Sequence, residues 1–377
     1  MDRNEMDTMH TANDVVQADL EYICDKLAQE FPKLDGKRLL ITGGAGFLGY
    51  YLVQAALHWN QTRASKPVQV LVYDNFIRGV PEWLTALEGD ANLTVQKYDV
   101  IEPLPHDLGD VDWIIHAASI ASPMFYRKFP IETMDANVNG LRQLLDYTHA
   151  QGKAGKPLGG FLYYSTSEIY GDPTGDNIPT PETYRGNVSC TGPRACYDES
   201  KRYGETLCVN FAQQYDLPVR IARPFNNYGP GLKISDRRVL PDFVRNVLNN
   251  EDIVMLSDGA PTRTFCYIAD AIVGYYKILL VGQNGESYNI GIDTPEISMR
   301  ELAERVIALG ETLWGYNGKL VLGESDDKDY LTDNPNRRCP IIDKAREHLN
   351  YEPGIGIDDG LQRALVWYSG NREAEDA

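Results

Sequence analysis

Short apolar runs alternate with longer segments of helical period along the first half of the chain. Runs such as 39–41, 68–72 and 113–115 have the length and residue types of buried parallel strands. The segment 50–58 (YYLVQAALH) has the spacing of apolar residues that is typical of a helix. Because strands that alternate with helices form βαβ units, the pattern over 36–187 predicts an α/β fold with a Rossmann-type, doubly wound parallel sheet.

The pattern becomes mixed beyond about residue 226, which indicates a smaller, interleaved α/β lobe that binds substrate. There the spacing predicts helices at 240–248 and 269–281 and strands at 253–256, 264–268 and 287–290. The expected parts are an N-terminal extension (1–36), a Rossmann domain (37–225, with returns near 264–290), the lobe (mainly 226–370) and a frayed tail (371–377). Residues 1–11 are polar and expected to be disordered, after which Asn13 or Asp14 is expected to cap a helix.

Composition excludes several classes of function. The chain has 377 residues, 43% of them hydrophobic, which is enough for one large core and a smaller lobe. Its formal net charge of −18 disfavours binding to nucleic acid or to an anionic membrane. Without an apolar run of roughly 18 residues, we expect neither a membrane span nor a signal peptide. Six cysteines without a C-x-x-C pair indicate reduced thiols in the cytoplasm, and six histidines without an H-x-x-H pair indicate no metal site.

A glycine-rich turn follows the first apolar run. The segment TGGAGFLG places Gly43, Gly46 and Gly49 at three-residue spacing. Such glycines permit a tight turn, let a pyrophosphate approach the backbone, and let the next helix pack close to the strand. Asp74 ends the second strand, where it can hydrogen-bond the adenosine ribose and repel a 2′-phosphate. This favours NAD over NADP, although Arg78 lies close enough to weaken the preference.

A second pattern lies further along the chain, where Tyr197 and Lys201 stand four residues apart. Residues at this spacing share one face of a helix. A lysine ammonium beside a phenol favours the phenolate. Lys201 is therefore expected to lower the pKa of Tyr197 from its usual value of about 10 toward that of a working general base. Alone the pair is weak evidence, and it gains force from the dinucleotide-binding turn upstream.

The pairing of T-G-x-x-G-x-x-G with Y-x-x-x-K resembles the extended short-chain dehydrogenase/reductase family, whose members act on nucleotide sugars. The resemblance extends over about 36–353 and implies NAD as the cofactor. The cofactor contacts that it implies are Gly43, Gly46, Phe47, Leu48, Asp74, Asn75, Arg78, Asp99, Val100, Ala117, Ala118 and Lys201. In the relatives, helices like 129–150 and 197–215 pair across a two-fold axis, which implies a homodimer.

The resemblance also implies a shared first step of the reaction. Family members oxidise a sugar carbon, usually C4, with NAD. Tyr197 falls on the residue that removes the hydroxyl proton, and Thr166 on the catalytic Ser or Thr that hydrogen-bonds the same oxygen. The 4-keto sugar then has three fates: hydride return to the other face in an epimerase, loss of water in a 4,6-dehydratase, or loss of carbon dioxide in a uronate decarboxylase.

Three segments favour decarboxylation. Thr166-Ser167-Glu168 resembles the triplet of the nucleotide-glucuronate decarboxylases, where Glu168 would lie near C5 and C6, whereas dehydratases carry Thr-Asp-Glu. The segment ASPMFYRKFP resembles S-P-x-x-Y-x-x-x-P, whose tyrosine, here Tyr126, helps to hold the uronate carboxylate. The segment ACYDESKR differs from the decarboxylase pattern A-C-Y-D-E-G-K-R at Ser200.

Basic residues of the lobe are implied to hold the substrate. The segment DRRV resembles D-G-R-V, with Arg237 where glycine is usual. One of Arg337 and Arg338 is expected to grip the diphosphate, since a guanidinium fork suits phosphate oxygens, and the sequence leaves open which. The implied substrate-binding residues are Tyr126, Asn226, Arg238, Arg263, Arg337 and Arg338.

The sequence is therefore interpreted as an NAD-dependent nucleotide-sugar decarboxylase, with UDP-glucuronate as the expected substrate and UDP-xylose as the expected product. Its expected catalytic residues are Tyr197, Lys201, Thr166, Glu168 and Ser167. A C4 epimerase or a 4,6-dehydratase is the nearest alternative. A non-catalytic NAD-binding scaffold is the remote alternative, and the intact catalytic residues count against it because a scaffold needs none of them.

Overall fold

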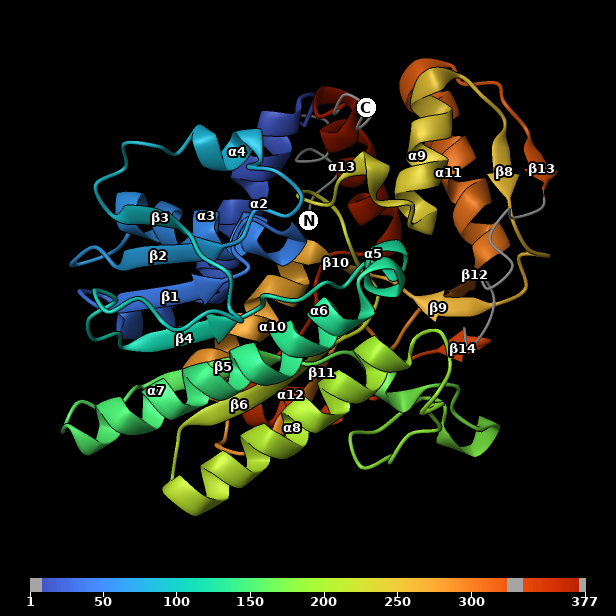
Figure 1. Ribbon diagram of the computed structural model, residues 1–377. Helices are drawn as coiled ribbons and strands as arrows, with labels where there is room; N and C mark the ends of the chain where they lie inside the picture. The colour runs from blue at the N-terminus through green and yellow to red at the C-terminus, as the bar shows by residue number, and fades with distance from the viewer. Residues whose placement is uncertain (1–8, 324–334, 373–377) are drawn as a thin grey trace.

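The computed structural model describes residues 9–323 and 335–372 and is organised around a seven-stranded parallel sheet (Figure 1). The strands, in spatial order, are β11 (Ser287–Ile290), β6 (Val219–Pro224), β5 (Gly160–Tyr164), β4 (Trp113–His116), β1 (Arg38–Thr42), β2 (Gln69–Asp74) and β3 (Leu93–Lys97). The order reverses between β1 and β4, where doubly wound sheets open a crevice for ligands. The predicted Rossmann-type sheet is confirmed. The predictions for residues 1–8 and 373–377 lie outside the described residues.

Alternate residues of β1 face two separate cores, as the pleat of a strand requires. Leu39 and Ile41 belong to the core under α2 (Ala12–Lys26), α3 (Phe47–Thr62) and α10 (Ile268–Val281). Leu40 belongs to the core under α7 (Leu141–Lys153) and α8 (Ala195–Tyr215). The two helical layers cover opposite faces of the sheet in Figure 1. Burial on both faces explains why these strands read as continuous apolar runs.

The N-terminal helix α2 begins at a different residue from the one predicted. Thr11 is the cap: its hydroxyl accepts from the amide of Asp14 at 3.2 Å, and the Asp14 carboxylate accepts from the amide of Thr11 at 2.9 Å. The prediction of Asn13 or Asp14 as the cap is wrong, because this reciprocal box uses Asp14 as the third helical residue instead. The helix packs on α3, α10 and α13 (Ile357–Gly370).

A buried ion pair joins the two ends of the described chain. Asp19 in α2 accepts from Arg363 in α13 at 2.6 Å, and both side chains are almost fully buried. The hydroxyls of Tyr51 and Tyr267 donate to the same carboxylate, each at 2.6 Å. The extension is thus part of the main core.

The lobe contains α9 (Val239–Asn249), α11 (Met299–Trp314) and three small sheets, and stands at the carboxyl edge of the main sheet (Figure 1). These sheets are β12 (Glu296–Ser298), β9 (Thr262–Thr264) and β14 (Arg337–Arg338); β13 (Leu320–Leu322) and β8 (Ile253–Met255); and β10 (Cys266–Tyr267) and β7 (Asn227–Tyr228). The predicted single strand 264–268 is wrong: β9 and β10 belong to different sheets, and α10 already begins at Ile268.

Shorter helices complete the described part of the chain. They are α4 (Glu82–Thr85), α5 (Pro123–Lys128), α6 (Pro130–Asp135) and α12 (Asp343–Leu349), with a π-helical turn over Ala136–Gly140 and 3₁₀ turns over Phe31–Leu34, Ser167–Tyr170, Gly175–Asn177 and Ile234–Asp236. No helix in residues 9–323 or 335–372 combines the length and the apolar composition needed to cross a bilayer.

Candidate active site

A cavity of about 950 Å³ opens at the carboxyl edge of the sheet, between the Rossmann core and the lobe. Of the predicted site residues, all but Arg337 line it. They are Gly43, Gly46, Phe47, Leu48, Asp74, Asn75, Arg78, Asp99, Val100, Ala117, Ala118, Tyr126, Thr166, Ser167, Glu168, Tyr197, Lys201, Asn226, Arg238, Arg263 and Arg338. The fold therefore brings together residues from segments that are up to about 300 positions apart in the sequence.

The turn between β1 and α3 has the geometry of a cradle for a pyrophosphate. Gly43 has a φ of +75°, and a Cβ placed there would come within 2.6 Å of the backbone of Ala118. A Cβ on Gly49 would lie 2.1 Å from the carbonyl oxygen of Gly44. Among the described residues no side chain caps α3, whose first residue Phe47 lines the cavity. The amide groups and the dipole of this helix end thus suit an anionic group.

Acidic side chains continue this end of the cavity. The carboxylate of Asp74 accepts from the amide of Ala45 at 3.0 Å and from the amide of Phe76 at 2.8 Å. Burial raises the pKa of Asp74 and these two hydrogen bonds oppose the rise. Asn75 donates to Asp99 at 2.9 Å. A glycine cradle beside carboxylates at the second strand end fits a dinucleotide whose ribose carries free hydroxyls.

The predicted catalytic pair lies on the first turns of α8. Tyr197 is buried, and Thr166 lies near enough to its phenol to lower the pKa of the phenol. The Lys201 ammonium donates to the carbonyl oxygen of Tyr164 at 2.8 Å and lies 5.8 Å from the centre of the Tyr197 ring. Residues at positions i and i+4 of one helix thus face the same cavity.

The protein's own groups raise the pKa of Tyr197 to about 12, because burial outweighs the opposing effect of Thr166. The prediction that the protein lowers this pKa is therefore wrong for the chain by itself. Burial also lowers the pKa of Lys201 to about 7, which weakens its positive charge near neutral pH. His116 behind them is buried and neutral, since burial lowers its pKa to about 3.

Arginines surround Glu168 beside this pair. Arg338 donates two hydrogen bonds to the Glu168 carboxylate, at 2.5 and 2.6 Å, and Arg194 donates a third. Burial raises the pKa of Glu168, but Arg338 and Arg194 outweigh burial and hold it below its usual range. Burial and the nearby Glu168 charge raise the pKa of Asp198 to about 7. The carboxylates of Glu168 and Asp198 therefore lie close enough to Tyr197 in space to raise its pKa.

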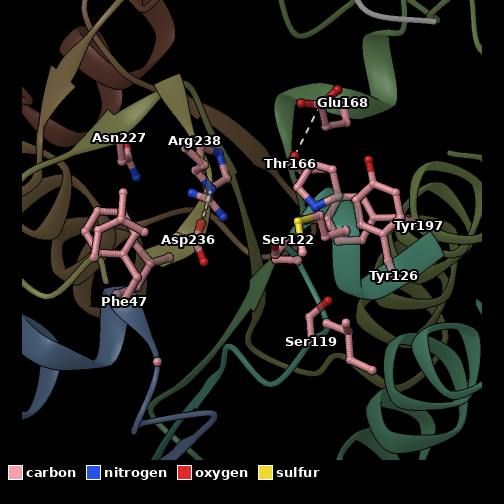
Figure 2. Close-up of a pocket in the computed structure, with 18 of the residues that line it drawn as sticks. Phe47, Ser119, Ser122, Tyr126, Thr166, Glu168, Tyr197, Asn227, Asp236 and Arg238 are labelled. Atoms are coloured by element: carbon pink, nitrogen blue, oxygen red, sulfur yellow. Dashed lines mark hydrogen bonds and ion pairs between the residues drawn. The ribbon is translucent and has the colours of Figure 1, made fainter. Parts of the chain in front are cut away.

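Tyr126 forms the wall of the cavity next to Tyr197. Its ring stacks on Tyr197 with centres 5.2 Å apart and planes 10° apart, as Figure 2 shows. Its hydroxyl is buried and has no hydrogen-bond partner within residues 9–323 and 335–372, and the same holds for the hydroxyls of Ser119 and Ser122. Buried hydroxyl groups in a cavity wall normally have a partner, so this wall is built to receive polar groups of a ligand.

The lobe supplies the opposite wall. Arg238 pairs with Asp236 at 2.8 Å, and Asn226 donates to the carbonyl oxygen of Thr264 at 2.9 Å. Arg263 donates to the carbonyl oxygen of Pro335 at 2.5 Å.

The neighbours Arg337 and Arg338 point to different places, because successive side chains of a strand alternate in direction. Arg337 binds Glu296 at the surface, with hydrogen bonds of 2.9 and 2.7 Å, whereas Arg338 lines the cavity. The structure thus distinguishes the two arginines.

Many residues outside the predicted set also contribute to the site, and three charged ones bear on its chemistry. Arg194 and Asp236 line the cavity, and Asp198 pairs with Arg194 behind it. Arg194 and Asp198 flank Tyr197 in the segment RACYD, so their nearness in sequence to the predicted catalytic tyrosine was the available signal. In residues 9–323 and 335–372, no cluster of three or more His, Cys, Asp or Glu side chains forms a metal site.

Most of the chain is similar in sequence to known proteins. The model of the NAD dependent epimerase/dehydratase family matches residues 39–291. Among curated proteins, UDP-glucuronic acid decarboxylase 3 of Arabidopsis thaliana is 38% identical over 324 residues, which cover 86% of each chain. UDP-glucuronic acid decarboxylase 1 of Xenopus tropicalis is 35% identical, covering 89% of this chain and 72% of that protein.

Solved structures agree on the fold. The dTDP-glucose 4,6-dehydratase DesIV of Streptomyces venezuelae, with NAD and TYD bound, superposes with a TM-score of 0.75 at 27% identity, covering 89% of this chain and 98% of that one. The epimerase Mth375 of Methanothermobacter thermautotrophicus has the same TM-score at 26% identity, covering 93% of this chain and 96% of that one.

Proposed function

The chain belongs to the NAD dependent epimerase/dehydratase family, and from this premise we propose that it is a nucleotide-sugar decarboxylase that converts UDP-glucuronate to UDP-xylose with NAD as its cofactor. Relatives that are 35–38% identical over most of the chain are named UDP-glucuronic acid decarboxylases. The dehydratase alternative is disfavoured, since Ser167 stands where the dehydratases carry an acidic residue.

The observation that carries the proposal is the arginine cluster beside Thr166 and Tyr197. Arg338 and Arg194 already bind one carboxylate there, that of Glu168. Arginine forks bind carboxylates in this bidentate manner, and a uronate carries its carboxylate on the carbon next to the reacting centre. A neutral hexose has no group of matching charge at that place.

The proposed roles follow from the positions of the side chains. When bound in the glycine cradle, NAD supplies the two-electron acceptor for C4 of the sugar. Tyr197, as its phenolate, accepts the proton of the C4 hydroxyl, and Thr166 is the proposed hydrogen-bond partner of the same oxygen. The C4 carbonyl makes the sugar a β-keto acid. The bond from C5 to the carboxyl carbon breaks, carbon dioxide leaves, and the electron pair moves to the C4 oxygen as an enolate.

The proton that Tyr197 takes returns to the C4 oxygen at the end of the cycle. Because the chain by itself raises the pKa of Tyr197 to about 12, the phenolate would have to be stabilised for this step by the positive charge of bound NAD. C5 then takes a proton from water, and C4 takes back the hydride from the reduced cofactor, so the overall reaction is redox-neutral. The free hydroxyl of Tyr126 is the proposed donor to the substrate carboxylate.

The test is mass spectrometry of the purified protein incubated with UDP-glucuronate, with and without added NAD. We expect a product lighter by one carbon dioxide that co-elutes with UDP-xylose, and no product from Tyr197→Phe. An unchanged mass with a shifted retention time would identify a C4 epimerase and refute decarboxylation. Loss of water from a neutral hexose nucleotide would identify a dehydratase.

We also propose a cytoplasmic homodimer that pairs through α6, α7 and α8. Exposed apolar side chains on α6 and α8 support the pairing: Ile131 is 63% exposed, Met134 43% and Tyr203 52%. The six cysteines are free, which suits a reducing compartment. Analytical ultracentrifugation tests the assembly, and Tyr203→Glu is expected to yield monomers.

A further inference from the structure

One buried carboxylate ties together the two sides of the cavity. Asp236 ends a 3₁₀ turn of the lobe, Ile234–Asp236, and its side chain is 1% exposed. It accepts from the guanidinium of Arg78, which lies in the loop after β2 of the Rossmann core. It also pairs with the Nε of Arg238 at 2.8 Å. This bridge, Arg78–Asp236–Arg238, therefore connects elements from opposite sides of the cavity.

Two further contacts hold Arg78 in place. The ammonium of Lys233 donates to the carbonyl oxygen of Arg78 at 3.2 Å. The guanidinium of Arg78 also stands 5.0 Å from the centre of the Phe125 ring, in α5. The loop after β2 thus meets both the lobe and α5 at one residue. Arg78, which was expected to weaken the preference for NAD, instead donates a hydrogen bond to the carboxylate of Asp236.

The bridge lies where a bound cofactor would be enclosed. Arg78, Asp236 and Arg238 all line the cavity, together with Asp74 and Asn75 at its ribose end. Figure 2 shows Asp236 and Arg238 across the cavity from Tyr126 and Tyr197, joined by the dashed line of their ion pair. The bridge thus extends from the ribose end of the cavity toward the catalytic end.

We infer that Asp236 is a positioning residue whose bridge between Arg78 and Arg238 holds the cavity closed over NAD and retains the cofactor from one turnover to the next. The inference rests on the cofactor-binding part of the proposed function. A cofactor that leaves must part the two sides of the cavity and separate Asp236 from Arg78, and unpaired buried charges are costly. Retention suits a redox-neutral cycle, because the oxidised cofactor is regenerated in place and need not exchange.

The experiment measures how fast the intact protein loses NAD, without any sugar substrate. Protein loaded with adenine-labelled NAD is mixed with excess unlabelled NAD, and the label that stays bound is followed by rapid filtration. The variants are Arg78→Met, Asp236→Asn and the double variant, with Arg78→Lys as the conservative change. Arg63→Met is the matched control, since Arg63 forms ion pairs between α3 and α2, outside the residues that line the cavity.

We expect Arg78→Met and Asp236→Asn each to raise the dissociation rate of NAD by about tenfold or more, which corresponds to one lost charge-assisted contact. The double variant should lose NAD no faster than the faster single variant, because both changes break the same bridge. Arg78→Lys should restore most of the retention, and Arg63→Met should match the wild type.

Dissociation rates within about twofold of the wild type in both single variants would overturn the inference, as would multiplicative effects in the double variant. Arg78 is partly exposed, so Arg78→Met remains a folded test if Asp236→Asn does not fold. The outcome is separate from that of the proposed function: faster loss of NAD in a protein that forms no UDP-xylose would leave the bridge standing and refute the decarboxylase.

Discussion

Replacing Arg338 with methionine tests the role of the arginine cluster around Glu168, and the same replacement at the neighbouring Arg337 is the control. Arg338 and Arg337 are adjacent in β14, and the sequence alone does not predict which of the two binds substrate. Arg338 is buried against Glu168, while Arg337 binds Glu296 at the surface with its side chain 46% exposed. We expect Arg338→Met to impair both stability and catalysis, and Arg337→Met to have little effect on either.

The magnitude follows from what each substitution leaves behind. Arg338→Met removes two short hydrogen bonds to a carboxylate whose side chain is 19% exposed. Breaking one partner out of a buried pair costs about 3–5 kcal/mol, and the remaining contact from Arg194 places the expected loss near the lower end, about 3 kcal/mol. Arg337→Met breaks an exposed pair, for which the expected loss is below about 1 kcal/mol.

The pH dependence of the loss has a definite sign. The folded pKa of Glu168 is below its ordinary value, so its pairing contributes stability above the unfolded pKa of about 4.3. That contribution fades as the pH falls through the lower folded pKa. The difference in the free energy of unfolding between wild type and Arg338→Met should therefore be full at pH 7 and shrink below about pH 4.

The assays are urea denaturation at pH 7 and pH 3.5 and steady-state formation of UDP-xylose. Under the proposed function, Arg338→Met should lower kcat/KM by about 10- to 100-fold, the equivalent of one charged contact, while Arg337→Met stays within about twofold. Equal losses in the two variants, or a loss in Arg338→Met that does not change with pH, would refute the reasoning about the cluster.

Three further predictions concern single side chains. Asp198→Asn should raise the free energy of unfolding at pH 8, because burial raises the folded pKa of Asp198 to about 7 and the ionised form is therefore disfavoured. The gain in stability should vanish below about pH 4, where Asp198 is protonated in both the folded and the unfolded state. Thermal denaturation across this pH range checks both expectations. Arg237→Gly should stabilise the protein by about 1 kcal/mol in urea denaturation, because Arg237 has a φ of +55°, where glycine is unstrained; a loss would contradict this. Thr11→Ala should cost about 1 kcal/mol and Asn13→Ala almost nothing, since Thr11 caps α2; equal costs would argue against the capping box.

Patterns that are local in the sequence were sufficient for the fold class and for many of the residues that line the cavity. The apolar runs were recognisable because strands such as β1 are buried on both faces, and the turn at Gly43 because only glycine suits its φ of +75°. Tyr197 and Lys201 were recognisable because the pitch of one helix sets their distance. The predicted contacts from different motifs converge on one cavity, although their individual roles remain proposals.

Tertiary structure alone decided the features that depend on distant partners. Which of Arg337 and Arg338 faces the cavity follows from the pairing of β14 with β9, and the raised pKa of Tyr197 follows from burial by the surrounding segments. The bridge through Asp236 joins residues 158 positions apart. Hydrophobic period and backbone preference are properties of a few consecutive residues and can be read from the sequence. Burial and electrostatic energy depend on which groups the completed fold places within a few ångströms, and no local pattern encodes that arrangement.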